Sequence, residues 1–172
     1  MRSIEVEPPR PIEEGDDISG FRSGVEKVDA WLKDRAMGAR SAGSAVVYVT
    51  LHKGRVVGYY SLSAQSITRK RAMGWLGRNS PDQIPVILLG MLGVDTEYQG
   101  IGLGTALLRD ASRRALRVSQ QVGARALVVD PIDESAAGFY RTAGFREIPG
   151  TSRMYAKLAH PEPEMETGET TF

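Results

Sequence analysis

The chain has 172 residues, of which 41% are hydrophobic, so it is long enough for one compact domain with a buried core. It has no cysteine, and its two histidines, His52 and His160, are not in a metal-ligand spacing, so we expect no disulfide, no cysteine nucleophile and no metal. The net charge of +1 is unevenly distributed: both ends are acidic, whereas residues 21–160 contain 20 Lys and Arg against 11 Asp and Glu, which favours polyanionic partners.

The first 20 residues contain three prolines and an acidic run, which predicts a short strand at most, followed by a loop. A signal peptide would instead be basic and then apolar, and no stretch of the sequence is long and apolar enough for a membrane span. We therefore expect a cytoplasmic protein without membrane contact.

Residues 25–40 are predicted to form one amphipathic helix, with Ser23 as a candidate N-cap, because apolar side chains recur at helical spacing: Val28, Trp31, Leu32 and Ala39. Residues 45–51 and 56–63 are rich in β-branched and aromatic residues, and the turn His52-Lys53-Gly54-Arg55 joins them. These two segments predict an antiparallel hairpin.

Residues 69–84 combine basic residues with glycine, proline and Trp75, which predicts a loop with a short helix. Residues 85–94 are almost continuously apolar, as in a strand that is buried on both faces. Gly90 and Gly93 within this strand indicate a bulge or the close approach of another backbone or a ligand.

A glycine-rich loop, Gln99-Gly100-Ile101-Gly102-Leu103-Gly104, follows this strand. It leads into a helix predicted over residues 105–122, whose core-facing residues are expected to be Ala106, Leu107, Ala111, Leu116 and Val118. Glycines allow positive φ and leave no Cβ in the way, so consecutive N–H groups can converge on an anion at the positive end of the helix dipole. The loop therefore predicts a phosphate-binding site.

The rest of the chain is predicted to form a strand over 124–129, a helix over 135–143 and a strand over 154–158. Residues 161–172 are acidic and lack periodicity, which predicts a disordered tail after a domain of residues 1–160. The element order indicates an α+β protein with three α/β/α layers, in which a mostly antiparallel mixed sheet contains a central β-α-β crossover.

Spacing alone leaves several interpretations of the loop open. A P-loop would place Lys directly after its last glycine, whereas Thr105 follows Gly104 here. A dinucleotide fingerprint would need glycine at Thr105 and almost no residues between the strand and the first glycine, although Asp130 could serve as its ribose acid. A plain tight turn is a further alternative.

Three motifs in order resemble the GCN5-related N-acetyltransferase (GNAT) superfamily. Gln99-x-x-Gly102-x-Gly104 matches the family's Q/R-x-x-G-x-G/A signature. The other two motifs are Leu92-Gly93-Val94-Asp95-x-x-Tyr98-Gln99-Gly100 and Ala136-Ala137-Gly138-Phe139-Tyr140-x-x-x-Gly144-Phe145. The resemblance implies the GNAT fold, with splayed strands that hold acetyl-CoA.

Within the superfamily, residues 17–158 resemble the TacT-type acetyltransferase toxins. The resemblance depends on three segments: Phe21-x-x-Gly24 with Val28-Asp29-x-Trp31-Leu32, Gly54-Arg55-Val56-Val57-Gly58-Tyr59-Tyr60, and Arg78-Asn79-x-Pro81-Asp82-x-Ile84-Pro85-Val86. It implies a type II toxin that acetylates the α-amine of aminoacyl-tRNA and blocks translation, a ribbon-helix-helix antitoxin, and a homodimer. Met91 departs from the family, in which many relatives have Arg.

The resemblance also implies roles for individual residues. The acetyl-CoA site would consist of strand residues Leu92, Gly93 and Val94 and of the loop amides of Gln99, Gly100, Ile101, Gly102, Leu103, Gly104 and Thr105. Tyr140 would act as the general acid toward the departing thiolate. Without the resemblance, Tyr140 would be read as a core aromatic.

No residue qualifies as a general base, which favours an α-amine acceptor over lysine, because the lower pKa of an α-amine leaves more of it neutral at cellular pH. The absence of cysteine favours direct transfer in a ternary complex. The basic residues of the irregular segment are candidates for contact with the tRNA backbone: Arg69, Lys70, Arg71 and Arg78.

Two other functions are compatible with the same motifs. One is a GNAT enzyme that acetylates a small amine or a protein N-terminus. The other is a non-catalytic regulator that binds CoA.

Overall fold

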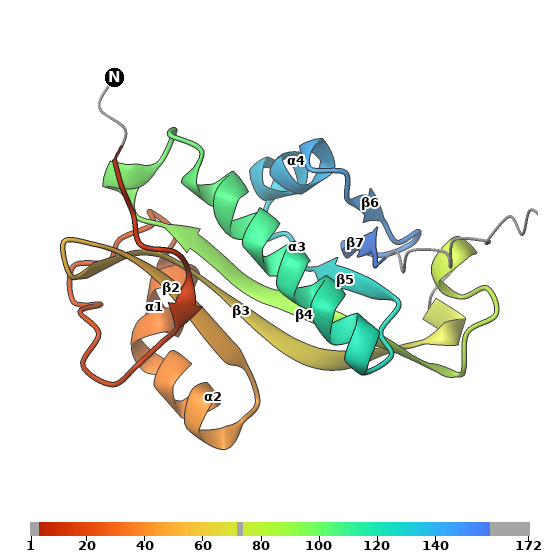
Figure 1. Ribbon diagram of the computed structural model, residues 1–172. Coiled ribbons are helices and arrows are strands. Elements are labelled where there is room, and N and C mark those ends of the chain that lie inside the picture. The colour runs from red at the N-terminus through yellow and green to blue at the C-terminus, as the bar shows by residue number, and fades with distance from the viewer. Residues whose placement is uncertain (1–3, 72–73, 159–172) are drawn as a thin grey trace, which may run out of the picture.

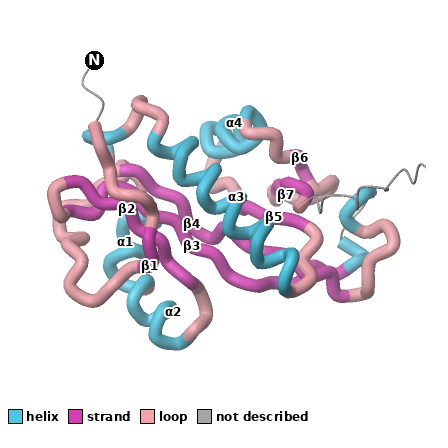
Figure 2. Tube along the Cα trace, in the orientation of Figure 1, coloured by secondary structure: helices cyan, strands magenta, loops and turns pink. Residues whose placement is uncertain are grey.

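The computed structural model describes residues 4–71 and 74–158, with the backbone alone at Arg71. Within these ranges seven strands form one mixed sheet in the order β1-β2-β3-β4-β5-β7-β6 (Figure 2). The strands are β1 (Arg10–Pro11), β2 (Val46–His52), β3 (Arg55–Thr68), β4 (Gln83–Val94), β5 (Ala126–Val129), β6 (Arg146–Glu147) and β7 (Met154–Lys157). Neighbouring strands are antiparallel except for β4 and β5, which are parallel.

Four α-helices and three short 3₁₀ helices accompany the sheet in the described part of the chain. The α-helices are α1 (Glu26–Asp34), α2 (Ala36–Ala42), α3 (Leu103–Gln121) and α4 (Glu134–Thr142). The 3₁₀ helices are η1 (Arg69–Arg71), η2 (Gly74–Leu76) and η3 (Thr96–Tyr98). None of the described helices is long and apolar enough to cross a membrane.

The sheet separates two layers of helices. Helices α3 and α4 lie on one face, and α1 and α2 lie on the other (Figure 1). Side chains alternate along β4: Ile87 and Leu89 join the core cluster under α3, whereas Val86 and Leu88 belong to the cluster that includes Trp75 of η2. This arrangement confirms the predicted α+β class with three layers.

Two helix predictions were wrong in detail. Residues 25–40 form two helices, because Arg35 leaves helical geometry with φ −123°, and α1 begins after Val25, without a side-chain cap from Ser23. In α3, Ala106 is exposed and Val118 is 46% exposed, while Leu108 and Ala115 are buried in their place. The contacts of the helix with the sheet and with α4 decide which side of the apolar stripe is covered.

The irregular segment ends slightly earlier than predicted, because β4 already begins at Gln83, and the strand predicted over 56–63 continues to Thr68. Its described parts are the 3₁₀ helices η1 and η2 and the turn that follows them. The predicted acidic tail, residues 161–172, lies outside the described residues.

Strands β4 and β5 diverge near the middle of the sheet. They pair only from Ile87 to Leu89 of β4, because β5 ends at Val129 while β4 continues to Val94. At the same point β4 bulges away from regular pairing with β3, and Ser61 Oγ accepts the Met91 N–H at 3.0 Å. Gly90 allows this contact, since a Cβ there would lie 2.9 Å from Ser61 Oγ. The divergence leaves the edge of β4 open beyond Leu89.

Candidate functional site

A cavity of about 250 Å³ lies where β4 and β5 diverge, between the end of β4, the entry to α1 and the first turns of α4. Five residues predicted for the site line it: Leu92, Gly93, Val94, Gln99 and Tyr140. They come from β4, from the glycine-rich loop and from α4, so the fold brings together motifs that are far apart in the sequence. The remaining predicted loop residues, from Gly100 to Thr105, continue from this cavity into the start of α3.

The glycine-rich loop presents its backbone amides at the N-terminus of α3. Gly100 and Gly102 have φ of +78° and +87°, a region that favours glycine, and Gly102 is the N-cap. In the described part of the chain, the N–H groups from Gln99 to Thr105 donate no hydrogen bond to other protein groups. Unpaired amides at the positive end of a long helix can bind an anion such as a pyrophosphate.

Side chains around the loop hold it in place. Leu103 is buried, while Ile101 is 55% exposed. Gly104 lies close to β4 and α4, because a Cβ there would be 3.8 Å from both Val94 and Phe139. The start of α3 is therefore packed against the wall of the cavity.

The side chain of Gln99 positions the loop from within. Its Nε2 donates to the carbonyl oxygens of Ser23 and Val94, both at 2.8 Å, which joins the entry to α1 and the end of β4. A second hydrogen bond fixes the loop to the β2–β3 hairpin: His52 Nδ1 and the Tyr98 hydroxyl lie 2.6 Å apart. His52 thus supports the residue that precedes Gln99.

The free edge of β4 offers further backbone groups. The Asp95 N–H donates to the Val57 carbonyl on β3, at 2.8 Å, so alternation directs the peptide groups of Gly93 to β3 and those of Leu92 and Val94 to the open edge. Since Gln99 already occupies the Val94 carbonyl, the Leu92 N–H and C=O and the Val94 N–H face the divergence. An extended ligand with amide groups can pair with this edge as an added strand does.

Gly93 has a separate packing role. A Cβ at this position would lie 2.5 Å from Val28 Cγ1, so the missing side chain lets α1 pack directly on β4. Gly93 was predicted to belong to the site, and it does line the cavity. Its own N–H and C=O groups face β3, so they are not free to pair with a ligand.

Tyr140 projects from α4 into the cavity and is 8% exposed. Its ring makes edge-on contacts with Phe139 and Phe145, with centroid distances of 5.3 and 5.4 Å. Burial raises the pKa of the Tyr140 phenol to about 12. The phenol therefore stays protonated at neutral pH, and burial alone, with no hydrogen bond from the described residues, accounts for the shift, so the hydroxyl can donate to a ligand.

Sequence reasoning missed part of the cavity wall: Ser23, Val25, Val28, Ile132, Asp133, Ser135, Ala136 and Phe139. Ala136 and Phe139 belong to the motif that contains Tyr140, and that motif was the available signal. The three residues before and in α1 reach the cavity only through long-range packing of α1 on β4, which no local pattern indicates.

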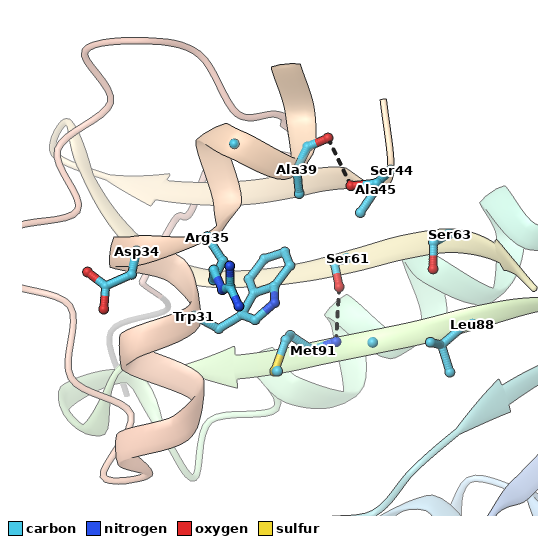
Figure 3. Close-up of a pocket in the computed structure, with 12 residues that line it drawn as sticks. Trp31, Asp34, Arg35, Ala39, Ser44, Ala45, Ser61, Ser63, Leu88 and Met91 are labelled. Carbon is cyan, nitrogen blue, oxygen red and sulfur yellow. Dashed lines mark hydrogen bonds between the residues drawn. The ribbon is translucent and has the colours of Figure 1, made fainter. Parts of the chain in front are cut away.

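A second groove of about 600 Å³ lies on the opposite face of the sheet, beside α1 and α2 (Figure 3). Its apolar wall includes Trp31, Leu88 and Met91, and its polar groups include Ser61 and Ser63. Neighbouring residues of β4 border the two openings, because Met91 lines the groove and Leu92 lines the first cavity. The sequence placed Trp31 in an apolar stripe and did not indicate a groove.

The basic candidates lie away from both openings. Arg69, Lys70 and Arg78 are exposed at the η1–η2 end of β3 and β4, whereas the glycine-rich loop follows the other end of β4 (Figure 1). They share a sheet face with the second groove, because Leu88 both lines that groove and packs with Trp75 of η2. The side chain of Arg71 lies outside the description.

Comparison with known proteins adds independent findings. Residues 43–147 match the family model described as "Acetyltransferase (GNAT) domain". The chain is 40% identical over 150 residues to the "tRNA-acetylating toxin" of Mycobacterium tuberculosis. The aligned region covers 87% of this chain and 90% of that toxin.

Two solved structures share the fold. AtaT complexed with acetyl-methionyl-tRNAfMet has a TM-score of 0.81 and 23% identity, covering 89% of this chain and 95% of AtaT. The second structure is a Tyr-to-Phe mutant of the toxin AtaT, bound to the C-terminus of the antitoxin AtaR and to acetyl-CoA. It has a TM-score of 0.76 and 22% identity, and the match covers 90% of this chain and 94% of AtaT.

Proposed function

Because the chain belongs to the GNAT acetyltransferase family, we propose that it transfers an acetyl group from acetyl-CoA to the α-amine of aminoacyl-tRNA. In this proposal the chain is the toxin of a type II toxin-antitoxin pair, and the modified tRNA blocks translation. The observation that carries the proposal is the likeness to the tRNA-acetylating toxin of M. tuberculosis, which extends over most of both chains.

The unpaired backbone groups of the first cavity fit acetyl-CoA. The amides from Gln99 to Thr105 would hold the pyrophosphate, and the free groups of Leu92 and Val94 would pair with the pantetheine amides. When bound, acetyl-CoA supplies the thioester whose carbonyl carbon is attacked. Tyr140 lines the same cavity, as a residue that acts on the thioester sulfur must.

Acetyl transfer forms a nitrogen–carbon bond and breaks the carbon–sulfur bond, and a proton passes from the amine to the CoA sulfur. The pKa of about 12 at Tyr140 lies well above that of an ordinary thiol, near 8.5. Tyr140 would therefore stabilise the departing thiolate mainly through a donated hydrogen bond. Complete proton transfer from the phenol would be uphill unless its pKa falls on binding.

The acceptor and the partner protein follow from the relatives. AtaT has been solved with an acetylated aminoacyl-tRNA and with the C-terminus of its antitoxin, and we infer an aminoacyl-tRNA and an antitoxin for this chain. We further propose that the antitoxin is a ribbon-helix-helix protein, that the enzyme forms a homodimer, and that Arg69, Lys70 and Arg78 contact the tRNA backbone.

The test is an acceptor comparison. The purified protein is incubated with radiolabelled acetyl-CoA and, in parallel, with charged tRNA, deacylated tRNA, free amino acids and a peptide with a free N-terminus. Incorporation into charged tRNA alone is expected. Incorporation into small amines or peptides would favour a GNAT enzyme of another specificity, and acetyl-CoA binding without transfer to any acceptor would favour a non-catalytic regulator.

A further inference from the structure

The glycine-rich loop is joined to β4 through η3, so the position of η3 decides where the loop amides lie. Hydrogen bonds fix both ends of this connection. At its start, the buried Asp95 carboxylate accepts from the N–H groups of Arg22 and Glu97, at 3.1 and 3.0 Å. At its end, the side chain of Gln99 donates two hydrogen bonds of 2.8 Å. Tyr98 lies between these two contacts, directly before Gln99.

Tyr98 joins the connection both to the core and to the β2–β3 hairpin. Its ring is buried in the core cluster that includes Leu103 and Leu107 of α3. Its hydroxyl lies 2.6 Å from His52 Nδ1, and the two rings meet edge-on with a centroid distance of 5.4 Å. In one neutral tautomer of His52 the hydroxyl donates to Nδ1, and in the other the Nδ1–H donates to the hydroxyl oxygen. The contact is therefore a hydrogen bond in both tautomers.

The hairpin is a firm support for this contact. His52 and Arg55 form the last pair of β2 and β3, and the two residues between them both have positive φ, as a type I′ turn requires. The two flanking residues contact successive residues of η3, because His52 bonds to Tyr98 while the Arg55 guanidinium donates to the Glu97 carboxylate at 3.0 Å. The Glu97 side chain is 73% exposed, so water weakens that ion pair. The partly buried bond between His52 and Tyr98 is the stronger of the two.

The loop needs such support because its glycines make it easy to deform. Gly100 and Gly102 have φ of +78° and +87°, and glycine has many other conformations open to it. Amides that already converge bind an anion better than amides that must first be ordered, since ordering costs affinity. A hydrogen bond on the residue directly before Gln99 limits how far the following amides can move. His52 is not among the described residues that line the acetyl-CoA cavity, so it can act only through Tyr98.

On these observations, and resting on the proposed function, we propose that His52 is a positioning residue for acetyl-CoA. Through the Tyr98 hydroxyl it holds the amides from Gln99 to Thr105 in the arrangement that receives the pyrophosphate. It touches neither the thioester nor the acceptor amine. Its loss therefore weakens binding of the pyrophosphate part of the donor and leaves the thiol arm unaffected.

A comparison of CoA with pantetheine tests this proposal without requiring any acetylation. Pantetheine has the same thiol arm as CoA but lacks the pyrophosphate, so it can pair with β4 without using the loop amides. His52→Leu replaces the imidazole with an apolar side chain and should weaken CoA binding about fivefold, the scale of one lost hydrogen bond. Its affinity for pantetheine should equal that of the wild type. Titration calorimetry measures CoA binding, and ligand-observed NMR measures pantetheine binding.

A double-mutant cycle shows whether His52 acts through the Tyr98 hydroxyl. Tyr98→Phe keeps the buried ring, removes the hydroxyl, and should weaken CoA binding by the same factor as His52→Leu. The double variant should bind CoA no more weakly than either single variant, because both changes break the same contact. His52→Asn places a side-chain amide near the position of Nδ1, so it should restore most of the affinity.

Tyr48→Phe is the matched control. It removes a hydroxyl from the strand that carries His52, but its ring stacks on Tyr60, with a centroid distance of 5.0 Å, and not on the loop. Both affinities should stay at the wild-type values. Thermal unfolding of each variant verifies that it is folded.

Three results would overturn the proposal: unchanged CoA binding by His52→Leu, an equal loss for CoA and pantetheine, or additive effects of His52→Leu and Tyr98→Phe. An equal loss for both ligands would show a general structural role for His52. Failure of the wild type to acetylate any charged tRNA would contradict the proposed function alone, since neither ligand is measured with an acceptor present.

Discussion

At the scale of single residues, Tyr140 packs against Phe139 and Phe145 and lines the cavity proposed for acetyl-CoA. Burial keeps the phenol neutral, and a neutral phenol is a hydrogen-bond donor when negative charge develops on sulfur. Its role can be separated from packing, because phenylalanine retains the ring.

Tyr140→Phe should lower kcat by about 100-fold or more, the usual scale of a lost acid–base group. The KM for acetyl-CoA should change little, since backbone groups of the loop and of β4 are proposed to bind the donor. Steady-state kinetics measure both constants. Tyr155→Phe, a buried tyrosine stacked on Trp75 away from the cavity, should behave as wild type; an unchanged kcat for Tyr140→Phe would refute the assignment.

The pH profile of kcat/KM should have a rising limb and no falling limb below about pH 10. The acceptor must be a neutral amine, and an α-amine loses its proton near pH 7.7 to 8.0. Tyr140 must keep its proton, so activity is lost only as pH rises through its pKa, which burial has raised to about 12. A decline in activity between pH 8 and 9.5, absent from Tyr140→Phe, would contradict the raised pKa.

At the scale of elements, the glycine-rich loop and α3 act together, because Gly102 both turns the chain and caps the helix. Much of this unit could be predicted from the sequence, since glycine spacing and an amphipathic stripe are local signals. The break of the first helix at Arg35 and the exposure of Ala106 and Val118 could not, because packing against other elements decides them.

Gly102→Ala should raise the KM for acetyl-CoA several-fold and destabilise the protein by about 1–2 kcal/mol. The space around a Cβ is open at this position, so the cost comes from φ of +87°, which disfavours alanine. Chemical unfolding and the KM for acetyl-CoA measure the two effects. Gly123→Ala is the matched control, because neither positive φ nor a close neighbour opposes it, and it should leave both quantities unchanged.

At the scale of the whole molecule, residues of β4 border two openings, the cavity proposed for acetyl-CoA and the groove beside α1 and α2. The donor cavity could be predicted in large part, because its loop and Tyr140 belong to contiguous motifs. The groove beside α1 and α2 could not be predicted, because Trp31, Ser61 and Met91 come from different elements and share no spacing that a sequence reveals.

Simultaneous replacement of Arg69, Lys70 and Arg78 by Glu should raise the KM for charged tRNA about tenfold and flatten its dependence on salt concentration, because fewer phosphate contacts release fewer counterions. The KM for acetyl-CoA should not change. Kinetics at several salt concentrations measure these effects. The control reverses three exposed arginines of α3, on the other sheet face: Arg109, Arg113 and Arg117. An equal effect in the control would show that only overall charge matters.

In the proposed reaction, the acetyl group reaches the α-amine of the amino acid on tRNA. The direct measurement is its position: charged tRNA is treated with the protein and isotopically labelled acetyl-CoA, nuclease then releases the 3′ aminoacyl-adenosine, and fragmentation mass spectrometry locates the label. The expected product is an N-acetylated amino acid still esterified to adenosine. Label on the nucleoside itself, or on protein with none on the amino acid, would contradict it.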